Sequence, residues 1–396
     1  MRPSPPNAGR SSLVTEALDL DWPFFEVAHR ELALRLVKWC DEHLTDAHGA
    51  NVDDQCRALV HNLGRAEFLD HAVSHGQERP DVRSLAIARS ILARRSGLAD
   101  FAFAMQGLGS GAISLFGDSE QKKDFLHGVA AGSAIAAFAL TEPETGSDAA
   151  NISCRARRDG DEWVIDGEKS YISNGTIADV ITLFARTSDD GARGLSAFIL
   201  PVPTAGLSVA GRIEVIAPHP LARLKLEGVR LPAGALIGKE GEGFAIAMQT
   251  LNLFRVTVGA AALGFARRAL DEAIAFSTNR KLGSGTLADN AVTQERLAEM
   301  ALAIDASALL VARAAWQQDR GAVDNRRAAA MAKLHATEEA QKVIDMAVQL
   351  HGGLGVTTGS KVEELYREIR ALRIYEGASE VQRSIIARDI LKEHRA

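Results

Sequence analysis

Proline placement is the feature that most constrains the fold of this 396-residue chain. All 11 prolines lie at or before Pro232, so the final 164 residues contain none. Because a proline in a helix interior costs about 3 kcal/mol, a long proline-free stretch is typical of a helical bundle. Apolar residues also recur at helical spacing over residues 263–274 and 297–311. We therefore predict four or five long helices from about residue 243 to the C-terminus.

The middle of the chain has a different pattern. Five of the prolines fall between Pro201 and Pro232. Runs of strand length, rich in β-branched or aromatic residues, cover residues 134–140, 162–165, 180–185 and 195–200. Asp-Gly pairs at residues 159–160 and 166–167 supply turn signals between them. We predict a small β-barrel or sandwich of short strands in this part of the chain.

Helical patterns return in the N-terminal part, at residues 24–43, 81–96 and 119–128. The order of elements predicts a mainly α protein with a central β domain. The expected divisions are an N-terminal helical domain at 19–134, a central β domain at 135–242 and a C-terminal helical bundle at 243–396. Residues 1–18 begin with a basic, proline-broken stretch, which predicts a disordered tail.

Charge and cysteine usage exclude several functions. The net charge of −6 argues against a general nucleic-acid or anionic-membrane binder. No run approaches the roughly 18 apolar residues of a membrane span. The three cysteines, Cys40, Cys56 and Cys154, lack the spacing of metal ligands, so no metal site is expected. A reduced, cytoplasmic protein is the simplest interpretation.

Two short segments carry the chemistry. Glu376 precedes Gly377 on a predicted turn, with Ser379 as the expected N-cap of a last helix. Taken alone, such a glutamate is most often a solvated turn residue. Far upstream, residues 141–148 read Thr-Glu-Pro-Glu-Thr-Gly-Ser-Asp, where a strand enters a glycine-containing turn whose backbone N–H groups could bind an anion.

These segments, with Gly-Glu-Lys-Ser-Tyr-Ile-Ser-Asn-Gly at 167–175 and Gln-Leu-His-Gly-Gly-Leu-Gly at 349–355, resemble the acyl-CoA dehydrogenase family. The resemblance runs from about residue 20 to 392, with the four blocks in the family's order. It implies a helical N-terminal domain, a small β-barrel or sandwich and a C-terminal four-helix bundle. It also implies FAD as the cofactor and a homotetramer or homodimer. The family's Pro-x-x-Tyr-Gly-Gly loop is absent.

By this resemblance, one set of residues would bind the flavin. Tyr171 stands where the family usually has tryptophan, and Arg280 lacks the usual following Phe-Gly. Arg280 and the segment 349–353 would reach the flavin of a neighbouring subunit. The implied cofactor-binding residues are Phe138, Leu140, Thr141, Gly146, Ser147, Tyr171, Ile172, Ser173, Arg280, Gln349, Gly352, Gly353, Ala378, Ser379 and Glu380.

The resemblance also implies the reaction, which is α,β-dehydrogenation of an acyl-CoA thioester. Glu376 would remove the α-proton, and its backbone N–H would help to stabilise the thioester oxygen. Phe254 stands where the isovaleryl and long-chain branches place their glutamate, so their mechanism is excluded. The implied substrate-binding residues are Ser147, Asn252, Arg255, Tyr375, Gly377 and Arg388.

Two alternatives stay open. An acyl-CoA oxidase, or another flavin enzyme of the same fold, shares these motifs, and hydrogen peroxide release would separate it from a dehydrogenase that needs an electron-transfer flavoprotein. A non-catalytic helical binding protein would be colourless when purified. The sequence does not define the acyl chain.

Overall fold

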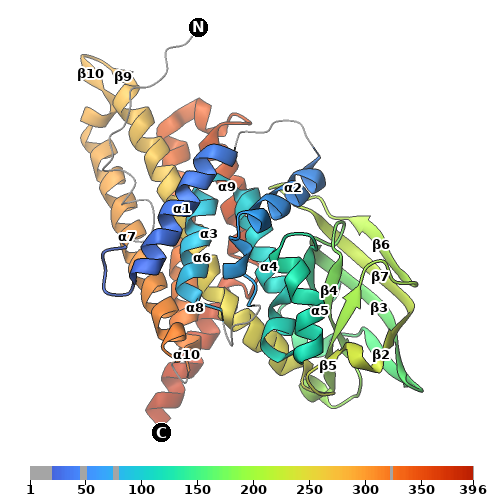
Figure 1. Cartoon of the computed structure of the whole chain (residues 1–396). Helices are drawn as coiled ribbons and strands as arrows, with labels where there is room; N and C mark the ends of the chain where they lie inside the picture. Colours follow the sequence, from blue (N-terminus) through green and yellow to red (C-terminus); the bar gives the residue numbers. More distant parts are fainter. Residues whose placement is uncertain (1–19, 45–50, 75–79, 322–323, 396) are drawn as a thin grey trace.

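The computed structural model describes residues 20–44, 51–74, 80–321 and 324–395, and the tail expected at residues 1–18 lies outside them. Helices at both ends of the chain lie beside a sheet formed by its middle (Figure 1). This arrangement confirms the predicted mainly α class with a central β domain.

Five helices form the N-terminal part: α1 (Val27–His43), α2 (Val52–Arg65), α3 (Val82–Arg95), α4 (Gly97–Phe116) and α5 (Ser119–Ala130). Local hydrogen bonds explain where two of them begin. The Asp81 carboxylate accepts from the backbone N–H groups of Arg83 and Ser84 in the first turn of α3, and Asp118 forms a capping box with Gln121 at the start of α5. Helices α2 and α4 were not anticipated from the sequence.

Eight strands form the sheet: β1 (Ala136–Ala139), β2 (Arg155–Asp159), β3 (Glu162–Ser173), β4 (Val180–Arg186), β5 (Leu195–Pro201), β6 (Leu207–Arg212), β7 (Leu221–Pro232) and β8 (Leu236–Ile237). Their order is β6-β7-β3-β2-β4-β5-β8, with β1 paired to β4. One residue pair, Arg155 with Arg186, joins β2 to β4. Trp163 of β3 contacts Phe198 of β5 at 5.2 Å between ring centres, although two strands separate them in the sheet. The two halves of the sheet therefore face each other over a common core.

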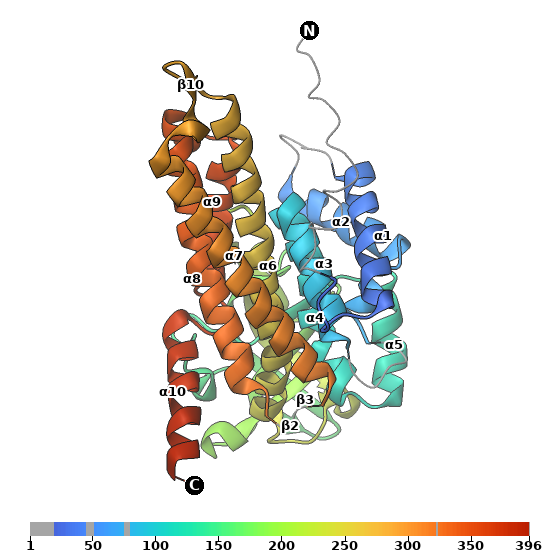
Figure 2. The same cartoon turned by 90° about the vertical axis from the view of Figure 1, so that its left-hand side faces the viewer.

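The C-terminal part consists of five helices: α6 (Gly243–Asn279), α7 (Ala291–Asp319), α8 (Arg326–His351), α9 (Lys361–Leu372) and α10 (Ser379–Arg395). The first three run side by side, with the hairpin β9 (Lys281–Leu282) and β10 (Gly285–Thr286) at one tip (Figure 2). Small residues allow this packing: a methyl group on Gly259 would lie 3.1 Å from the Ala332 carbonyl oxygen. The long proline-free helices agree with the prediction from proline placement.

Helix α6 differs from the expectation in one respect. By length and composition it could cross a membrane, although no such run was expected from the sequence. However, 78% of its most apolar window is buried inside the protein. We therefore describe α6 as the central helix of the bundle core, because helices that are apolar all round are buried in cores as well as in membranes.

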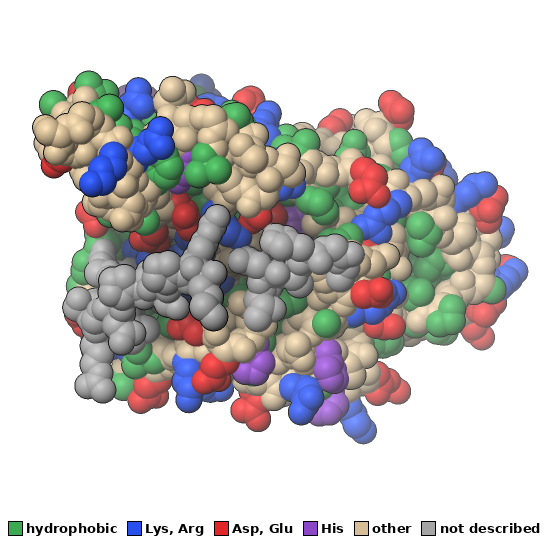
Figure 3. Space-filling model, turned by 90° about the horizontal axis from the view of Figure 1, so that it is seen from above, with side chains coloured by type: hydrophobic (Ala, Val, Ile, Leu, Met, Phe, Trp, Pro, Cys, Tyr) green, Lys and Arg blue, Asp and Glu red, His purple; other side chains and the backbone are tan. Residues whose placement is uncertain are grey.

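The surface is of mixed charge on the face shown in Figure 3, where acidic and basic side chains are interspersed. This pattern agrees with the modest net charge of −6.

Candidate active site

Glu376 lies on the turn between α9 and α10, as predicted. Its φ of 51° is in the left-handed region, and Gly377 follows with a φ of 90°. A non-glycine residue in this region is uncommon and costs about 1–3 kcal/mol. Two side chains hold the turn: Lys333 Nζ and Gln382 Nε2 donate to the Gly377 carbonyl oxygen at 2.8 and 2.7 Å. The surrounding protein therefore fixes the conformation that the glutamate adopts.

The Glu376 carboxyl is in an environment suited to a base. Its Oε2 atom is buried and has no hydrogen-bond partner within the described part of the chain. Burial raises the pKa of Glu376, whereas the positive charges of Arg89, Lys333 and Arg255 oppose that rise. Desolvation therefore favours the protonated form of the Glu376 carboxyl, and the neighbouring cations favour its ionised form.

The three cations come from three different helices, which is why no local pattern reveals them together. Arg89 belongs to α3, Arg255 to α6 and Lys333 to α8. Arg255 Nη1 donates to Asn252 Oδ1 at 3.0 Å, which joins two predicted substrate-binding residues. Its Nε atom has no partner among the described residues. Lys333 is completely buried, and burial lowers its pKa to about 8.

A buried ion pair, which was not predicted from the sequence, holds the Thr141–Asp148 segment in place. Glu142 accepts from Lys169 Nζ at 2.8 Å and from the backbone N–H groups of Ser153 and Cys154 at 2.6 and 2.9 Å. The Ser170 backbone N–H donates to the Thr141 carbonyl oxygen at 2.9 Å. Both charged residues lie inside the two motifs, but their neighbours in the sequence are mostly polar, so no local signal marks them as a buried pair. This ion pair therefore joins the two segments that were predicted to bind the flavin.

The region formed by these two segments has features that fit a flavin. Tyr171 is 60% exposed, and its φ of 56° marks an irregularity in β3 that turns the ring outward. Thr145 Oγ1 is buried without a partner in the described residues, and a methyl group on Gly146 would meet no atom within 4 Å. Ser147 is exposed beside them. An open backbone turn, unengaged hydroxyls and an uncovered aromatic ring suit a flat ring system with a phosphate tail.

Other predicted flavin residues lie below this surface. Leu140 and Ile172 are buried, and Phe138 packs against Phe184 at 4.9 Å between ring centres. Ser173, at the end of β3, is half-buried. These side chains pack within the β domain and do not line an open site.

The start of α10 differs from the sequence prediction. Ser379 is the first residue of this helix, and its hydroxyl donates to Glu338 Oε1 of α8 instead of capping α10. The predicted N-cap is therefore wrong, because a carboxylate on another helix accepts from the hydroxyl. Ala378 is half-buried and Glu380 is exposed.

A further predicted group lies at the other end of the bundle. Arg280 is the C-cap of α6, directly before the β9–β10 hairpin, and Gln349 and Gly352 are at the end of α8. Stacking of Phe276 on His351, with ring centres 4.3 Å apart, joins the two helix ends. Arg280 follows Arg255 by 25 residues, about 37 Å in an α-helix. The exposed side chains of Arg280 and Gln349, with the exposed Gly352 and Gly353, are therefore not brought to Glu376 within this chain.

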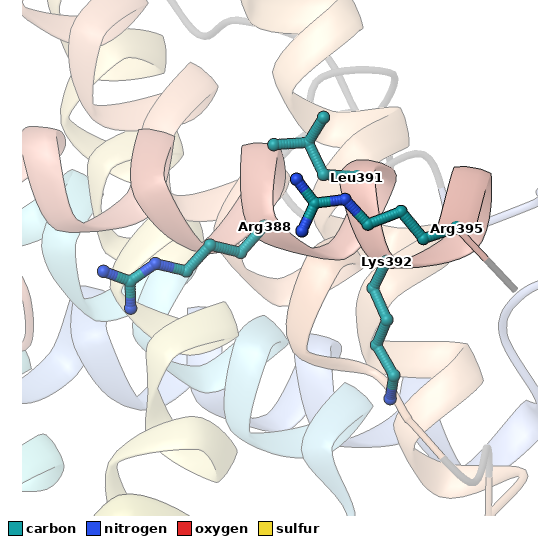
Figure 4. A pocket seen from close by; sticks show the side chains of 4 residues that line it. All are labelled: Arg388, Leu391, Lys392 and Arg395. Carbon is teal, nitrogen blue, oxygen red and sulfur yellow. The ribbon is translucent and has the colours of Figure 1, made fainter.

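Arg388 is also apart from the turn. It lies nine residues after Ser379 on α10, about 13 Å along the helix. With Leu391, Lys392 and Arg395 it lines a shallow hollow of about 400 Å³ (Figure 4). Tyr375 and Gly377 flank Glu376 directly.

Helices at both ends of the chain, a two-halved sheet and a glutamate whose Oε2 atom is buried near three cations define a mainly helical enzyme fold with a candidate base at Glu376. The acyl-CoA dehydrogenase middle-domain model matches residues 137–229, and the C-terminal-domain model of the same family matches residues 241–391. The chain belongs to the acyl-CoA dehydrogenase family, whose members are flavoproteins, and it is an oxidoreductase of that class.

Relatives span most of the chain. The probable acyl-CoA dehydrogenase FadE25 of Mycobacterium tuberculosis (strain ATCC 25618 / H37Rv) is 36% identical over 353 residues, 87% of this chain and 91% of that protein. The human mitochondrial short-chain specific acyl-CoA dehydrogenase is 40% identical over 291 residues, 72% of this chain and 70% of that protein. A Mycobacterium smegmatis glutaryl-CoA dehydrogenase solved with FADH2 has a TM-score of 0.85 at 29% identity, covering 93% of this chain and 95% of that one.

Proposed function

We propose that this chain oxidises an acyl-CoA thioester to the 2-enoyl-CoA, with Glu376 as the base that removes the α-proton. The observation that carries the proposal is the Glu376 carboxyl itself. Its Oε2 atom is buried without a hydrogen-bond partner among the described residues, and the positive charges of Arg89, Lys333 and Arg255 act on it. A raised pKa keeps a carboxylate basic enough to accept a carbon-bound proton, and the cations keep its ionised form accessible.

FAD is the cofactor we propose. Thr141, Gly146, Ser147 and Tyr171 would hold it on the surface that the Glu142–Lys169 ion pair stabilises. When bound, a flavin supplies the acceptor for the hydride that leaves the β-carbon. The protein contributes orientation and electrostatics: the rigid turn sets the position of Glu376, and its backbone N–H can donate to the thioester oxygen as negative charge develops there.

The site is proposed to be shared between copies of this chain. Arg280, Gln349, Gly352 and Gly353 are exposed at the far end of the bundle, so a second copy can present them to the flavin. A homodimer or homotetramer would complete each site in this way. We further propose a cytoplasmic enzyme that passes electrons to an electron-transfer flavoprotein.

The Glu376→Gln variant tests the base. Glutamine keeps the size of the side chain but cannot accept the proton, so we expect a loss of at least about 10³-fold in the rate of flavin reduction. Flavin content and acyl-CoA affinity should remain close to wild type. The matched control is Glu295→Gln, which is exposed on α7 and lies outside both sets of site residues. Near-normal reduction in Glu376→Gln would contradict the proposal.

The electron acceptor needs a separate measurement. We expect slow hydrogen peroxide release in air and fast turnover with an electron-transfer flavoprotein. Fast peroxide release instead would identify an acyl-CoA oxidase built on the same site.

A further inference from the structure

One carboxylate on α8 binds both ends of the turn that carries Glu376. Arg373, just before the turn, donates from Nε and Nη2 to Glu338 Oε1 and Oε2 at 3.0 and 2.8 Å. The Ser379 hydroxyl, just after the turn, donates to the same Oε1 atom. Glu376 lies midway, three residues after Arg373 and three before Ser379. Glu338 therefore joins the two ends of the segment whose centre is the proposed base.

The backbone closes the same segment. The Ser379 backbone N–H donates to the Arg373 carbonyl oxygen at 3.1 Å, so the two ends are bound to each other as well as to Glu338. In the middle, the Gly377 carbonyl oxygen accepts from Lys333 Nζ. Glu338 and Lys333 belong to one helix. Helix α8 thus holds the turn at its ends and at its centre.

Glu338 is suited to this role. Its side chain is 19% exposed, and the Arg373 side chain is 30% exposed. Burial opposes ionisation, yet the hydrogen bonds from Arg373 and Ser379 lower the pKa of Glu338, which keeps it ionised at working pH. Hydrogen bonds to an ionised acceptor are stronger than neutral ones, and two parallel bonds between arginine and a carboxylate also fix the relative orientation. The contact therefore defines the direction of the turn as well as its distance from α8.

The conformation of Glu376 needs such support. Its φ of 51° lies in the left-handed region, which a side chain rarely adopts unless the surrounding structure imposes it. A misplacement of about 1 Å near the chemistry can lower a rate about 100-fold. Without its anchors the turn would relax toward a commoner backbone conformation, and the Glu376 carboxylate would move with it. Residues that fix the turn therefore contribute to the rate without touching the substrate.

The charge of the base and its position depend on different residues. Arg89 of α3 and Asp100 of α4 form two parallel hydrogen bonds, Nε to Oδ1 and Nη2 to Oδ2, both at 2.8 Å. Their charges act on the pKa of Glu376 in opposite directions, since Arg89 lowers it and Asp100 raises it. A change of charge moves the pH dependence of the base. A change of position lowers the rate even at a pH where the base is fully ionised, so the two effects can be measured separately.

We propose that Glu338 is a positioning residue, which sets the place of the Glu376 carboxylate by binding both ends of its turn. It acts through Arg373 and Ser379, and the proton itself goes to Glu376. This inference rests on the proposed function. The effect of Glu338 falls on the rate of proton removal and leaves the affinity for acyl-CoA nearly unchanged.

Glu338→Gln tests the proposal at a pH well above the pKa of Glu376. Glutamine keeps the size of the side chain, but an NH2 group replaces one acceptor oxygen and meets the donors of Arg373 or Ser379. Flavin reduction is followed anaerobically by stopped flow, with the acyl-CoA that reduces wild-type flavin fastest in a panel from butyryl-CoA to palmitoyl-CoA. We expect the limiting rate per bound flavin to fall about 10- to 100-fold. The dissociation constant of the acyl-CoA should stay close to the wild-type value.

Two further variants show whether the loss comes from this contact. Arg373→Lys keeps the charge but not the two parallel hydrogen bonds, and should give an intermediate rate. Glu339→Gln is the matched control, because Glu339 is the next residue of α8, is 23% exposed and pairs with Lys342 at 2.8 Å. Its rate should equal that of the wild type. Because rates are taken per bound flavin, a smaller folded fraction does not affect them.

A double-mutant cycle separates positioning from a general loss of structure. Glu376→Asp keeps a carboxylate but draws it back by one methylene, so the fixed turn no longer holds it at the right distance. If Glu338 acts through the position of Glu376, adding Glu338→Gln should slow the Glu376→Asp protein by about 2-fold at most. An independent structural effect would instead multiply the two losses.

The outcomes separate this inference from the proposed function. A wild-type rate in Glu338→Gln, a loss confined to acyl-CoA affinity, or equal losses in the wild-type and Glu376→Asp proteins each overturn the inference. If Glu376→Gln is slow but Glu338→Gln is as fast as the wild type, only the inference fails. If Glu376→Gln reduces flavin at a near-normal rate, the proposed base fails, and the inference fails with it.

Discussion

Lys333 donates a hydrogen bond from Nζ to the Gly377 carbonyl oxygen at 2.8 Å, one residue after Glu376. The lysine is completely buried, and burial lowers its pKa to about 8. It acts on the proposed base in two ways, because it holds the turn and its charge opposes the rise in the pKa of Glu376. A buried amine on α8 is thus tied to a carboxylate 43 residues later.

Replacing this lysine by methionine should change the pH dependence of catalysis. The base must be ionised, so the rate rises as pH increases through the pKa of Glu376. Loss of the Lys333 charge raises that pKa further, and the acidic limb of the kcat profile should therefore move to higher pH. A looser turn should also lower the maximal kcat by about 10-fold or more. Lys342→Met, exposed on α8, is the control, and an unmoved limb in Lys333→Met would refute the electrostatic role.

Breaking the Glu142–Lys169 pair should destabilise the flavin-binding surface. Glu142→Gln leaves the fully buried Lys169 ammonium without its counter-charge, which costs about 3–5 kcal/mol. The free energy of unfolding from urea titration measures this loss, and bound flavin should fall with it. The double variant Glu142→Gln with Lys169→Met should recover part of the stability. Additive losses would argue against the pairing, and exposed Glu144→Gln is the neighbouring control.

Asp100→Asn should act on stability and on pH dependence in a definite direction. It leaves the buried Arg89 with an uncompensated charge, at a cost of about 3–5 kcal/mol. The Asp100 charge raises the pKa of Glu376, so its removal should shift the acidic limb of kcat to lower pH, opposite to Lys333→Met. Urea titration and a kcat profile measure the two effects. Shifts of the same sign in both variants would contradict this account, and exposed Asp345→Asn should show neither effect.

Gly111→Ala should cause a clash inside the molecule. The new methyl group would lie 2.9 Å from Phe254 Cε2 and from Thr250 Cγ2. Overpacking of this kind costs about 1–3 kcal/mol. Phe254→Leu in the same chain should relieve most of the loss in melting temperature. Gly234→Ala, where no atom lies within 4 Å of the new methyl group, should be neutral. A stable Gly111→Ala protein would show that α4 and α6 can separate.

The sequence predicted elements with a local or compositional signal. The absence of proline after Pro232 predicted the long helices, and Glu376 before Gly377 predicted the turn. Helix α4 had no such signal, because it is apolar on nearly all sides and contains the Gly-Leu-Gly-Ser-Gly stretch at 107–111, which is more typical of a loop. In the structure Gly107 and Gly111 make room for Phe254, and a methyl group on Gly109 would lie 2.7 Å from Ala136.

Only the site residues that lie in a family motif were predicted from the sequence. Glu376 and Arg255 were found by resemblance, but Arg89, Asp100 and Lys333 were not. The charge of Arg89 acts on Glu376 across a separation of 287 residues in the chain, and no sequence spacing encodes such proximity. Ser379 shows the converse error. A serine at a helix start is typical of a cap, but here the Glu338 carboxylate of another helix accepts from its hydroxyl.

The length of α6 has a genetic consequence if the flavin is held by two copies of the chain. Arg255 and Arg280 are about 37 Å apart along this single helix. Each copy would therefore supply Glu376 to one site and Arg280 to another. A Glu376→Gln chain and an Arg280→Glu chain, each inactive alone, would form mixed assemblies in which one of two sites is intact. Two defective alleles expressed together in one cell should therefore restore part of the activity that neither restores alone.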